Sequence, residues 1–343
     1  MNIEDRKKRI LAAIVEEYIR TGEPVGSKTL LKISDLNVSS ATIRNDMSEL
    51  FDEGFLEQPY TSSGRIPSHL GYRKYIDSLM CCKPLSAEEK AEIDALFNVR
   101  DPDPDKLMED AANVLSEYTK CAAIVASTTP KTVSVKKIDL VPVDSRTVVL
   151  ILLASNGVIK NKVCRTNFLL TPDIADFFRK FATDRFCGRT LDEISTLYVN
   201  SVTVSLGEYS RLFNPLILSI YELCREVWAG QFFVDGETNL LSYGEFEKIA
   251  HDLLSFISNK ADMSSLLNSK TSGAEVKIGK ENSNYELFGA SIVFAGYNVG
   301  KENGGTVGVI GPVRLNYRTL IPHIEYFANT LGKLLSETLQ HNE

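Results

Sequence analysis

Residues 39–54 read SSATIRNDMSELFDEG, and this stretch decides how the front of the chain folds. Ser39 or Ser40 can cap the start of a helix that runs to about Glu53, and Gly54 is suited to end it. At about 100° per residue, the large apolar side chains fall in one narrow stripe, which predicts a buried face. These residues are Ile43, Met47, Leu50 and Phe51.

The opposite face of this predicted helix is short and polar, with Ala41, Arg44, Asn45 and Ser48. Donors and acceptors of this kind suit the base edges and phosphate oxygens of DNA. Arg44 is the first candidate for a base or phosphate contact. The other candidates on this helix are Ser39, Ser40, Thr42, Asn45 and Ser48. An ordinary solvated helix face is the alternative interpretation of the same pattern.

The flanking segments place this helix third in a recognisable order. Apolar spacing predicts a helix over 6–21, and Ser27 can cap a second helix to about residue 34. A short strand at 55–60, a turn at 61–64 and a return strand at 65–67 predict a hairpin. Three helices and a hairpin form the winged-helix order, in which the third helix enters the major groove. The wing residues expected to contact phosphates are Thr61, Ser62, Ser63 and Arg65.

The charge balance is acidic overall but uneven. Among 343 residues, 38 Lys and Arg stand against 45 Asp and Glu, for a formal net charge of −7. This balance argues against a histone-like protein and against attraction to anionic membranes. Residues 58–76, however, contain no acid and include Arg65, Arg73 and Lys74. Because salt screens charges beyond about 10 Å, this local stretch is compatible with phosphate contacts.

Several other functional classes find no support in the sequence. No apolar run reaches the roughly 18 residues of a membrane span, and the N-terminus has no apolar signal core, so we expect a cytoplasmic protein with no membrane partner. The six cysteines and four histidines lack metal-ligand spacing, and no nucleophile-and-base motif is present. We therefore expect no metal, no cofactor and no catalytic residue; an enzyme tethered to DNA is a further alternative.

Beyond the hairpin, the pattern predicts an α+β multidomain chain. Residues 81–103 contain several prolines and predict a linker, which would let the first eighty residues move relative to the rest. A mainly helical block then interrupts what we expect to be a mixed sheet. The predicted strands are 122–127, 133–142, 147–153, 158–165, 276–278, 290–297 and 305–310. The predicted helices are 105–119, 174–182, 191–199, 212–228, 246–259 and 320–339.

Two loops imitate ligand-binding motifs without completing them. The glycine-rich residues 300–308 lack the P-loop pattern and precede a strand, so they predict a hairpin turn. Residues 235–239 lack the remaining oxygen ligands of a calcium loop, so they predict a turn packed against the core.

Blocks at both ends of the chain carry a family resemblance. The early blocks are PVGSKTL at 24–30, VSSATIRNDM at 38–47, TSSGRIP at 61–67 and GYR at 71–73. The late blocks are VDGETNLL at 234–241, IGKEN at 278–282 and GVIGPVR at 308–314. Together they resemble the heat-inducible transcription repressor HrcA family of bacteria. One departure is Tyr60, where the family usually has a histidine before the wing turn.

The resemblance implies a winged helix over 1–80, a linker over 81–103, and a sensor-type GAF-like domain at 104–165 and 231–343. It also implies that an inserted, mainly helical dimerisation domain at 166–230 splits the GAF-like domain. The implied function is repression of chaperone operons by a homodimer bound to an inverted-repeat operator in double-stranded DNA at the nucleoid. A chaperonin is the implied partner that keeps the repressor active until heat stress. The alternative is a regulator whose GAF-like domain senses a small ligand.

Overall fold

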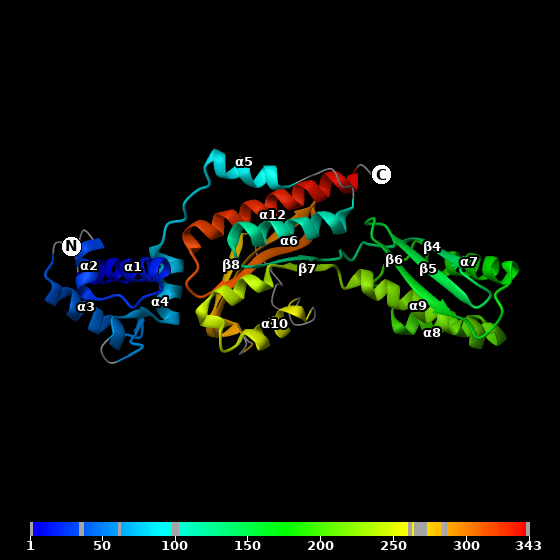
Figure 1. Cartoon of the computed structure of the whole chain (residues 1–343). Helices are drawn as coiled ribbons and strands as arrows, with labels where there is room; N and C mark the ends of the chain where they lie inside the picture. Colours follow the sequence, from blue (N-terminus) through cyan, green and yellow to red (C-terminus); the bar gives the residue numbers. More distant parts are fainter. Residues whose placement is uncertain are drawn as a thin grey trace.

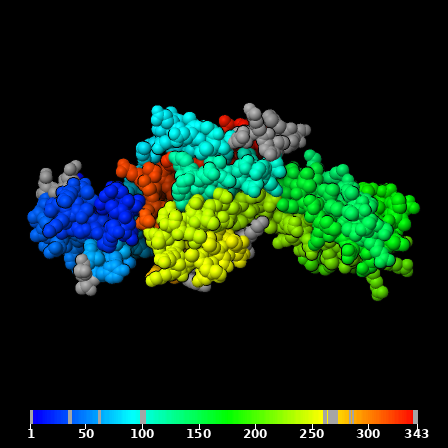
Figure 2. Space-filling model, viewed as in Figure 1, coloured from blue at the N-terminus to red at the C-terminus, as the bar shows by residue number. Residues whose placement is uncertain are grey.

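The computed structural model describes residues 3–33, 38–60, 63–97, 103–259, 263, 273–282, 284 and 287–340. Its helices and antiparallel sheets form three lobes that follow one another in Figure 1 and Figure 2. We call residues 3–79 the N-terminal unit, the five-stranded sheet with its helices the central unit, and the three-stranded sheet with its helices the inserted unit. No helix in the described ranges is both long and apolar enough to cross a membrane.

The N-terminal unit packs helices around one small core. Its elements are α1 (Ile3–Thr21), α2 (Ser27–Ile33), α3 (Ser40–Asp52), β1 (Leu56–Glu57), β2 (Ile66–Pro67) and α4 (His69–Lys74), which continues as a π-helical turn (Tyr75–Leu79). Ile10, Ile14, Leu30 and Ile43 are fully buried in this core. The predicted helices and hairpin are confirmed. The predicted burial of Phe51 is wrong: its side chain is 40% exposed, and the Arg65 guanidinium covers its ring.

The central unit is built on a five-stranded sheet with the strand order β7-β3-β10-β9-β8. Its strands are β3 (Ala122–Ser127), β7 (Phe232–Asp235), β8 (Ala274–Ile278), β9 (Ala290–Val299) and β10 (Glu302–Pro312). Every pair of neighbours is antiparallel, so the expectation of a mixed sheet is wrong. Residues 300–301 close the β9–β10 hairpin, as predicted for the glycine-rich stretch.

Strand alternation divides the central unit into two cores. Ala123, Val125, Val293 and Val307 face α6 (Pro104–Thr119) and α12 (Tyr317–Gln340), whereas their neighbours Ala122, Ile124, Ile292 and Phe294 face α10 (Ala250–Ser258). Figure 1 shows α6 and α12 on one side of the sheet and α10 on the other. Such a sheet, covered on both faces, fits a continuous apolar pattern in its central strands.

The inserted unit has a sheet and a core of its own. Strands β4 (Val135–Pro142), β5 (Thr147–Ala154) and β6 (Ile159–Arg165) pair as an antiparallel meander. Helices α7 (Pro172–Phe186), α8 (Thr196–Ser205) and α9 (Ser210–Trp228) complete the unit, and one buried cluster joins the strands to these helices. The boundary predicted at residue 165 is therefore wrong, because β4–β6 pair only with one another among the described strands. The insert is also a mixture of strands and helices rather than mainly helical.

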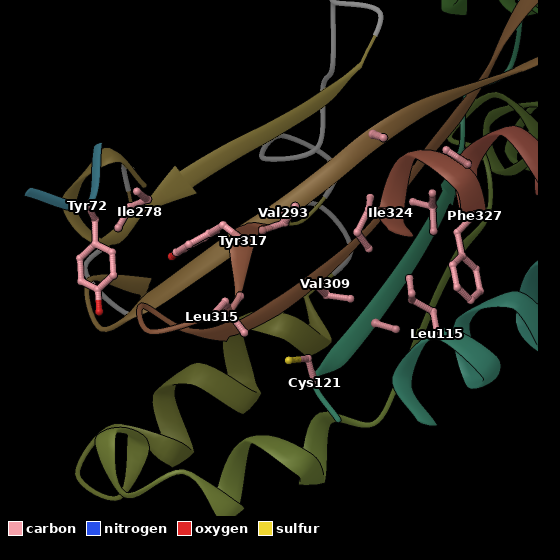
Figure 3. Close-up of a cluster of buried hydrophobic side chains, with 14 of the residues drawn as sticks. Tyr72, Leu115, Cys121, Ile278, Val293, Val309, Leu315, Tyr317, Ile324 and Phe327 are labelled. Carbon is pink, nitrogen blue, oxygen red and sulfur yellow. The ribbon is translucent and has the colours of Figure 1, made fainter. Parts of the chain in front are cut away.

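The N-terminal and central units share one continuous buried cluster. Tyr72 of α4 packs edge-on against Tyr317 at the start of α12, with ring centroids 6.2 Å apart, and Figure 3 shows Tyr72 beside Ile278 of β8. Within the predicted linker, α5 (Ala87–Leu96) lies along α12 and buries Ile93 completely. Residues 81–97 thus form a packed connection, and the expected free movement of the first eighty residues is not what the structure shows.

Candidate nucleic-acid interface

The start of α3 is held by hydroxyl groups. Ser39 caps the helix, since its Oγ accepts a hydrogen bond of 3.1 Å from the Thr42 amide and lies 3.0 Å from Thr42 Oγ1. Ser40 Oγ donates to Ser27 Oγ of α2 at 3.3 Å. Ser39 and Thr42 thus stabilise the start of α3, and Ser40 ties α3 to α2, so only part of the hydrogen-bonding capacity of these three predicted contact residues is free for a ligand.

The predicted polar face of α3 is open. Arg44, Asn45 and Ser48 are exposed, and within the described ranges their side chains have no hydrogen-bond or ion-pair partner. Ile43, Met47 and Leu50 point into the core on the opposite side. The structure thus brings together one guanidinium, one amide and one hydroxyl on a rigid helix, which are the groups that read base edges and bind phosphates.

The acidic side chains of α3 are neutralised on the side that packs against α1. Arg6 holds the buried Asp46 carboxylate in a two-pronged ion pair, with N–O distances of 2.6 and 2.9 Å. Lys7 Nζ lies 2.5 Å from Glu49 and 2.9 Å from Glu53, and its hydrogen bonds to these carboxylates raise the pKa of Lys7. In the sequence these acids stand close to Arg44, but in the structure the basic side chains of α1 offset their negative charges.

The hairpin is short and its return strand is tied to the segment before α2. Val25 and Arg65 exchange two backbone hydrogen bonds of 2.9 Å. A Cβ on Gly64 would lie 2.6 Å from the Val25 carbonyl, so glycine is required there. Ser63 Oγ accepts from the Tyr60 amide at 3.1 Å and donates to the Tyr60 carbonyl at 2.7 Å, while the Tyr60 side chain is 76% exposed. Thr61 and Ser62 lie outside the described residues.

Two basic residues differ from their predicted roles. Arg65 lies at the base of the hairpin rather than at its tip; its guanidinium is 4.8 Å from the Phe51 ring centroid, and its Nε is buried with no partner in the described chain. Arg73 turns toward the central unit, where it pairs with Glu281 and donates to the Val276 carbonyl at 2.7 Å. The positive stretch counted in the sequence is therefore partly used inside the molecule.

Two lysines that were not among the predicted contact residues lie on the helix next to α3. Lys28 and Lys32 lie one turn apart on α2 and are both exposed. Their spacing of four residues beside a predicted recognition helix was a visible signal. Among the described residues, by contrast, no group of three or more His, Cys, Asp or Glu could hold a metal ion.

Comparison with known proteins decides the family. Residues 105–321 match the model of the HrcA protein C-terminal domain. The heat-inducible transcription repressor HrcA of Clostridium perfringens (strain 13) is 36% identical, with 99% of each chain covered. The HrcA repressor of Clostridium botulinum (strain Eklund 17B) is 34% identical, with 98% of this chain and 99% of the relative covered.

This chain belongs to the HrcA family. It is a transcription repressor of the heat-shock response, as the sequence predicted, and a repressor of this kind is not in an enzyme class. A crystal structure of a hypothetical protein at 2.2 Å resolution is 24% identical and superposes with a TM-score of 0.65, with 97% of this chain and 99% of the other covered. That similarity supports the multidomain fold of this HrcA-family chain.

Proposed function

We propose that the N-terminal unit is a winged helix whose α3 enters the major groove of an operator. The observation that carries this proposal is the exposed Arg44–Asn45–Ser48 face, which has no partners in the described chain. Of the acids of α3, Asp46 and Glu49 are paired with α1, whereas the exposed Asp52 is not. Tyr60 and the Ser63 loop would then lie along the phosphate backbone. Lys28 and Lys32 add positive charge at the neighbouring helix.

A gel-shift titration tests this assignment. A duplex enriched by the wild-type chain from a random pool serves as the probe, because the operator bases do not follow from the structure. Arg44→Ala should weaken binding by about 1–3 kcal/mol, or roughly 5- to 150-fold, without unfolding the unit. Arg20→Ala is the matched control, since Arg20 is an exposed guanidinium of α1 that pairs with Glu17. Equal affinity of Arg44→Ala and wild type would refute the assignment.

We further propose that two copies bind an inverted repeat, with the inserted unit forming the dimer contact. One face of the β4–β6 sheet packs on the helices, and the other face presents apolar side chains with no cover in the described chain. Val141, Ile159 and Val163 on this face are 44%, 60% and 66% exposed. A contiguous apolar surface of this kind marks a protein contact, and closed two-fold symmetry is the commonest solution.

Sedimentation analysis tests the dimer. Ile159→Lys combined with Val163→Lys should convert dimer to monomer, because it places two charges on the uncovered sheet face. Leu197→Lys is the control, since Leu197 is 82% exposed on α8, away from the sheet. If Leu197→Lys alone converted the dimer to monomer, the dimer contact would lie on the helices and not on the sheet. Enriched operators without two-fold symmetry would contradict the inverted repeat.

Heat control follows from stability in this proposal. The free energy of unfolding of a domain is only about 5–15 kcal/mol, so heating raises the unfolded fraction. Fewer folded repressor molecules are then bound to the operator. We propose that a chaperonin returns the chain to its DNA-binding form, in keeping with the family resemblance. Operator binding by heat-treated chain should recover only when chaperonin and ATP are added. Equal recovery without chaperonin would contradict this partner.

We propose a division of the chain that follows the packing. The winged helix covers residues 1–80, and residues 81–97 of the predicted linker 81–103 form a packed connection. The central unit is the GAF-like domain, formed by residues 104–127 and 231–343, and the inserted unit spans 128–230. We also propose that the protein acts in the cytoplasm, at the nucleoid when it is bound to its operator.

The alternative, a regulator switched by a small ligand, has one observation in its favour. A cavity with apolar walls and polar groups lies between the central and inserted units. A metabolite extract that restored operator binding without chaperonin would favour this alternative.

A further inference from the structure

A cavity of about 180 Å³ lies where the central unit meets the inserted unit. Met108 of α6 and Tyr297 of β9 line it from the central unit. Val158 and Val227 line it from the inserted unit, next to β6 and on α9 respectively. The cavity is distinct from the nucleic-acid interface, and its walls come from both sides of the connection between the two units.

The walls of the cavity are mainly apolar and firmly built. Tyr297 is almost completely buried, and its hydroxyl donates to the Ala126 carbonyl at 3.3 Å and lies 3.5 Å from Met108 Sδ. Thr129 Oγ1 donates to the Val227 carbonyl at 2.7 Å, which ties the first residues of the insert to the end of α9. An apolar cavity of about 150 Å³ is large enough to bind benzene, so this space suits a ring or a short alkyl chain.

Asp105 supplies the polar group that sets the choice of ligand. Its Oδ2 accepts a hydrogen bond of 2.7 Å from Gln231 Nε2, but its Oδ1 is buried and has no partner in the described chain. Burial raises the pKa of Asp105, although the charge of Lys160 acts in the opposite direction. A buried carboxylate oxygen without a hydrogen-bond partner is stabilised most by a donor that carries a positive charge. The reason is that a charge-assisted hydrogen bond is stronger away from water.

The other charged groups that line the cavity do not satisfy Asp105. Lys160 is the basic side chain in the wall, and the wall also contains the exposed acids Glu226 and Glu302 in addition to Asp105. No ion pair joins Lys160 to any of these acids in the described chain. The cavity therefore has an excess of negative charge, which favours a cation over a neutral or anionic ligand.

We propose that this cavity binds a small organic cation, an amine that carries one ring or a short alkyl body. The Asp105 carboxylate turns its unpartnered Oδ1 from its covered position toward the cavity to accept from the ammonium group, and the apolar body lies between Met108, Tyr297 and Val227. Because the walls belong to two units, the bound amine holds the inserted unit in one orientation relative to the central unit. The site does not depend on the proposed DNA contacts, so its test uses no DNA.

Calorimetric titration of the purified full-length chain tests the site. Benzylamine is the probe, and benzyl alcohol and benzoate are the neutral and anionic controls of similar size. We expect benzylamine to bind at least tenfold more tightly than either control. Asp105→Asn should lower the benzylamine affinity at least tenfold, because it removes the charge and keeps the shape. Glu109→Gln, a change on the exposed side of the same helix, should leave the affinity unchanged.

A second variant separates loss of the site from loss of folding. Val158→Trp adds a large side chain from the inserted unit and leaves Asp105 in place, so it should abolish benzylamine binding while circular dichroism stays unchanged. Binding of benzylamine that is equal in wild type and Asp105→Asn would overturn the proposal. Benzoate binding as tight as benzylamine binding, or benzylamine binding retained by a folded Val158→Trp, would also overturn it.

Discussion

The contact between the N-terminal and central units provides a sharp test, because two buried tyrosines there have opposite hydrogen-bonding states. The Tyr317 hydroxyl donates to the Val313 carbonyl at 2.6 Å and lies 2.9 Å from Ser291 Oγ. The Tyr72 hydroxyl, by contrast, is buried with no partner in the described chain. Both side chains are at most 2% exposed. Phenylalanine at either position removes one oxygen and keeps the ring.

The expected changes in the free energy of unfolding follow from these partners. Tyr317→Phe removes a satisfied hydroxyl and strands the Val313 carbonyl, so it should cost about 1–3 kcal/mol. Tyr72→Phe removes a polar atom that gains nothing from its surroundings, so it should be neutral or stabilise the protein by about 1 kcal/mol. Only Tyr317→Phe should therefore destabilise the protein, although both variants delete the same atom from neighbouring rings.

Urea unfolding measured by two signals resolves the effect. The chain has one tryptophan, Trp228, and it lies in α9 of the inserted unit. Its fluorescence reports the inserted unit and should not change in either variant. Far-ultraviolet circular dichroism and hydrogen exchange of α4 and α12 should show an earlier transition for Tyr317→Phe. Equal midpoints for Tyr317→Phe and wild type, or an equal loss in Tyr72→Phe, would refute this reasoning.

Three further predictions concern the N-terminal unit and its contact with the central unit. Ile43→Ala should destabilise the unit by about 2–5 kcal/mol, because Ile43 is fully buried; an unchanged thermal melt would contradict the placement of α3. Gly71→Ala should destabilise it by at least about 1–3 kcal/mol, since a Cβ would lie 2.2 Å from the Phe55 carbonyl oxygen, and a crystal structure with an unshifted α4 would disprove the clash. Burial would raise the pKa of Glu281, but hydrogen bonds from Arg73 and the Ile278 amide hold it below its usual 4.5. The stability from this lowered pKa is present above about pH 4.5 and is lost as pH falls through the folded value, so Glu281→Gln should show a smaller drop in melting temperature below pH 4.5 than wild type does.

Local patterns in the sequence were sufficient for the elements of the N-terminal unit. The helical period of Ile43, Met47 and Leu50 places a buried stripe and an exposed Arg44 on opposite sides of α3, and the structure has both. Ser39 marks the start of that helix by its side-chain hydroxyl, and Gly54 marks its end by its left-handed backbone conformation. Phe51 lies at the edge of the stripe and remains 40% exposed, and the side chain that covers part of its ring is Arg65, fourteen residues further along the chain.

The directions of long charged side chains could not be predicted in this way. Arg73 lies in an acid-free stretch of sequence, yet its partner Glu281 lies 208 residues away. Asp46 and Arg6 are forty residues apart and form an ion pair only because α1 packs across α3. Residues that are distant in sequence determine whether a charge is free for DNA, and a local charge count cannot include them.

The sequence by itself determined most of the helices, most of the strands and the face of α3 that is open to a ligand, because these depend on periodicity and on capping within a few residues. The helix predicted at 191–199 is displaced, since α8 spans Thr196–Ser205. Only the tertiary structure decided which sheet each strand joins. Alternation in β5 shows that one face is buried, but it does not show whether β3 or β4 is the neighbour. Strand pairing is a contact between distant segments, as is the cavity between the central and inserted units, so both appear only after the chain has folded.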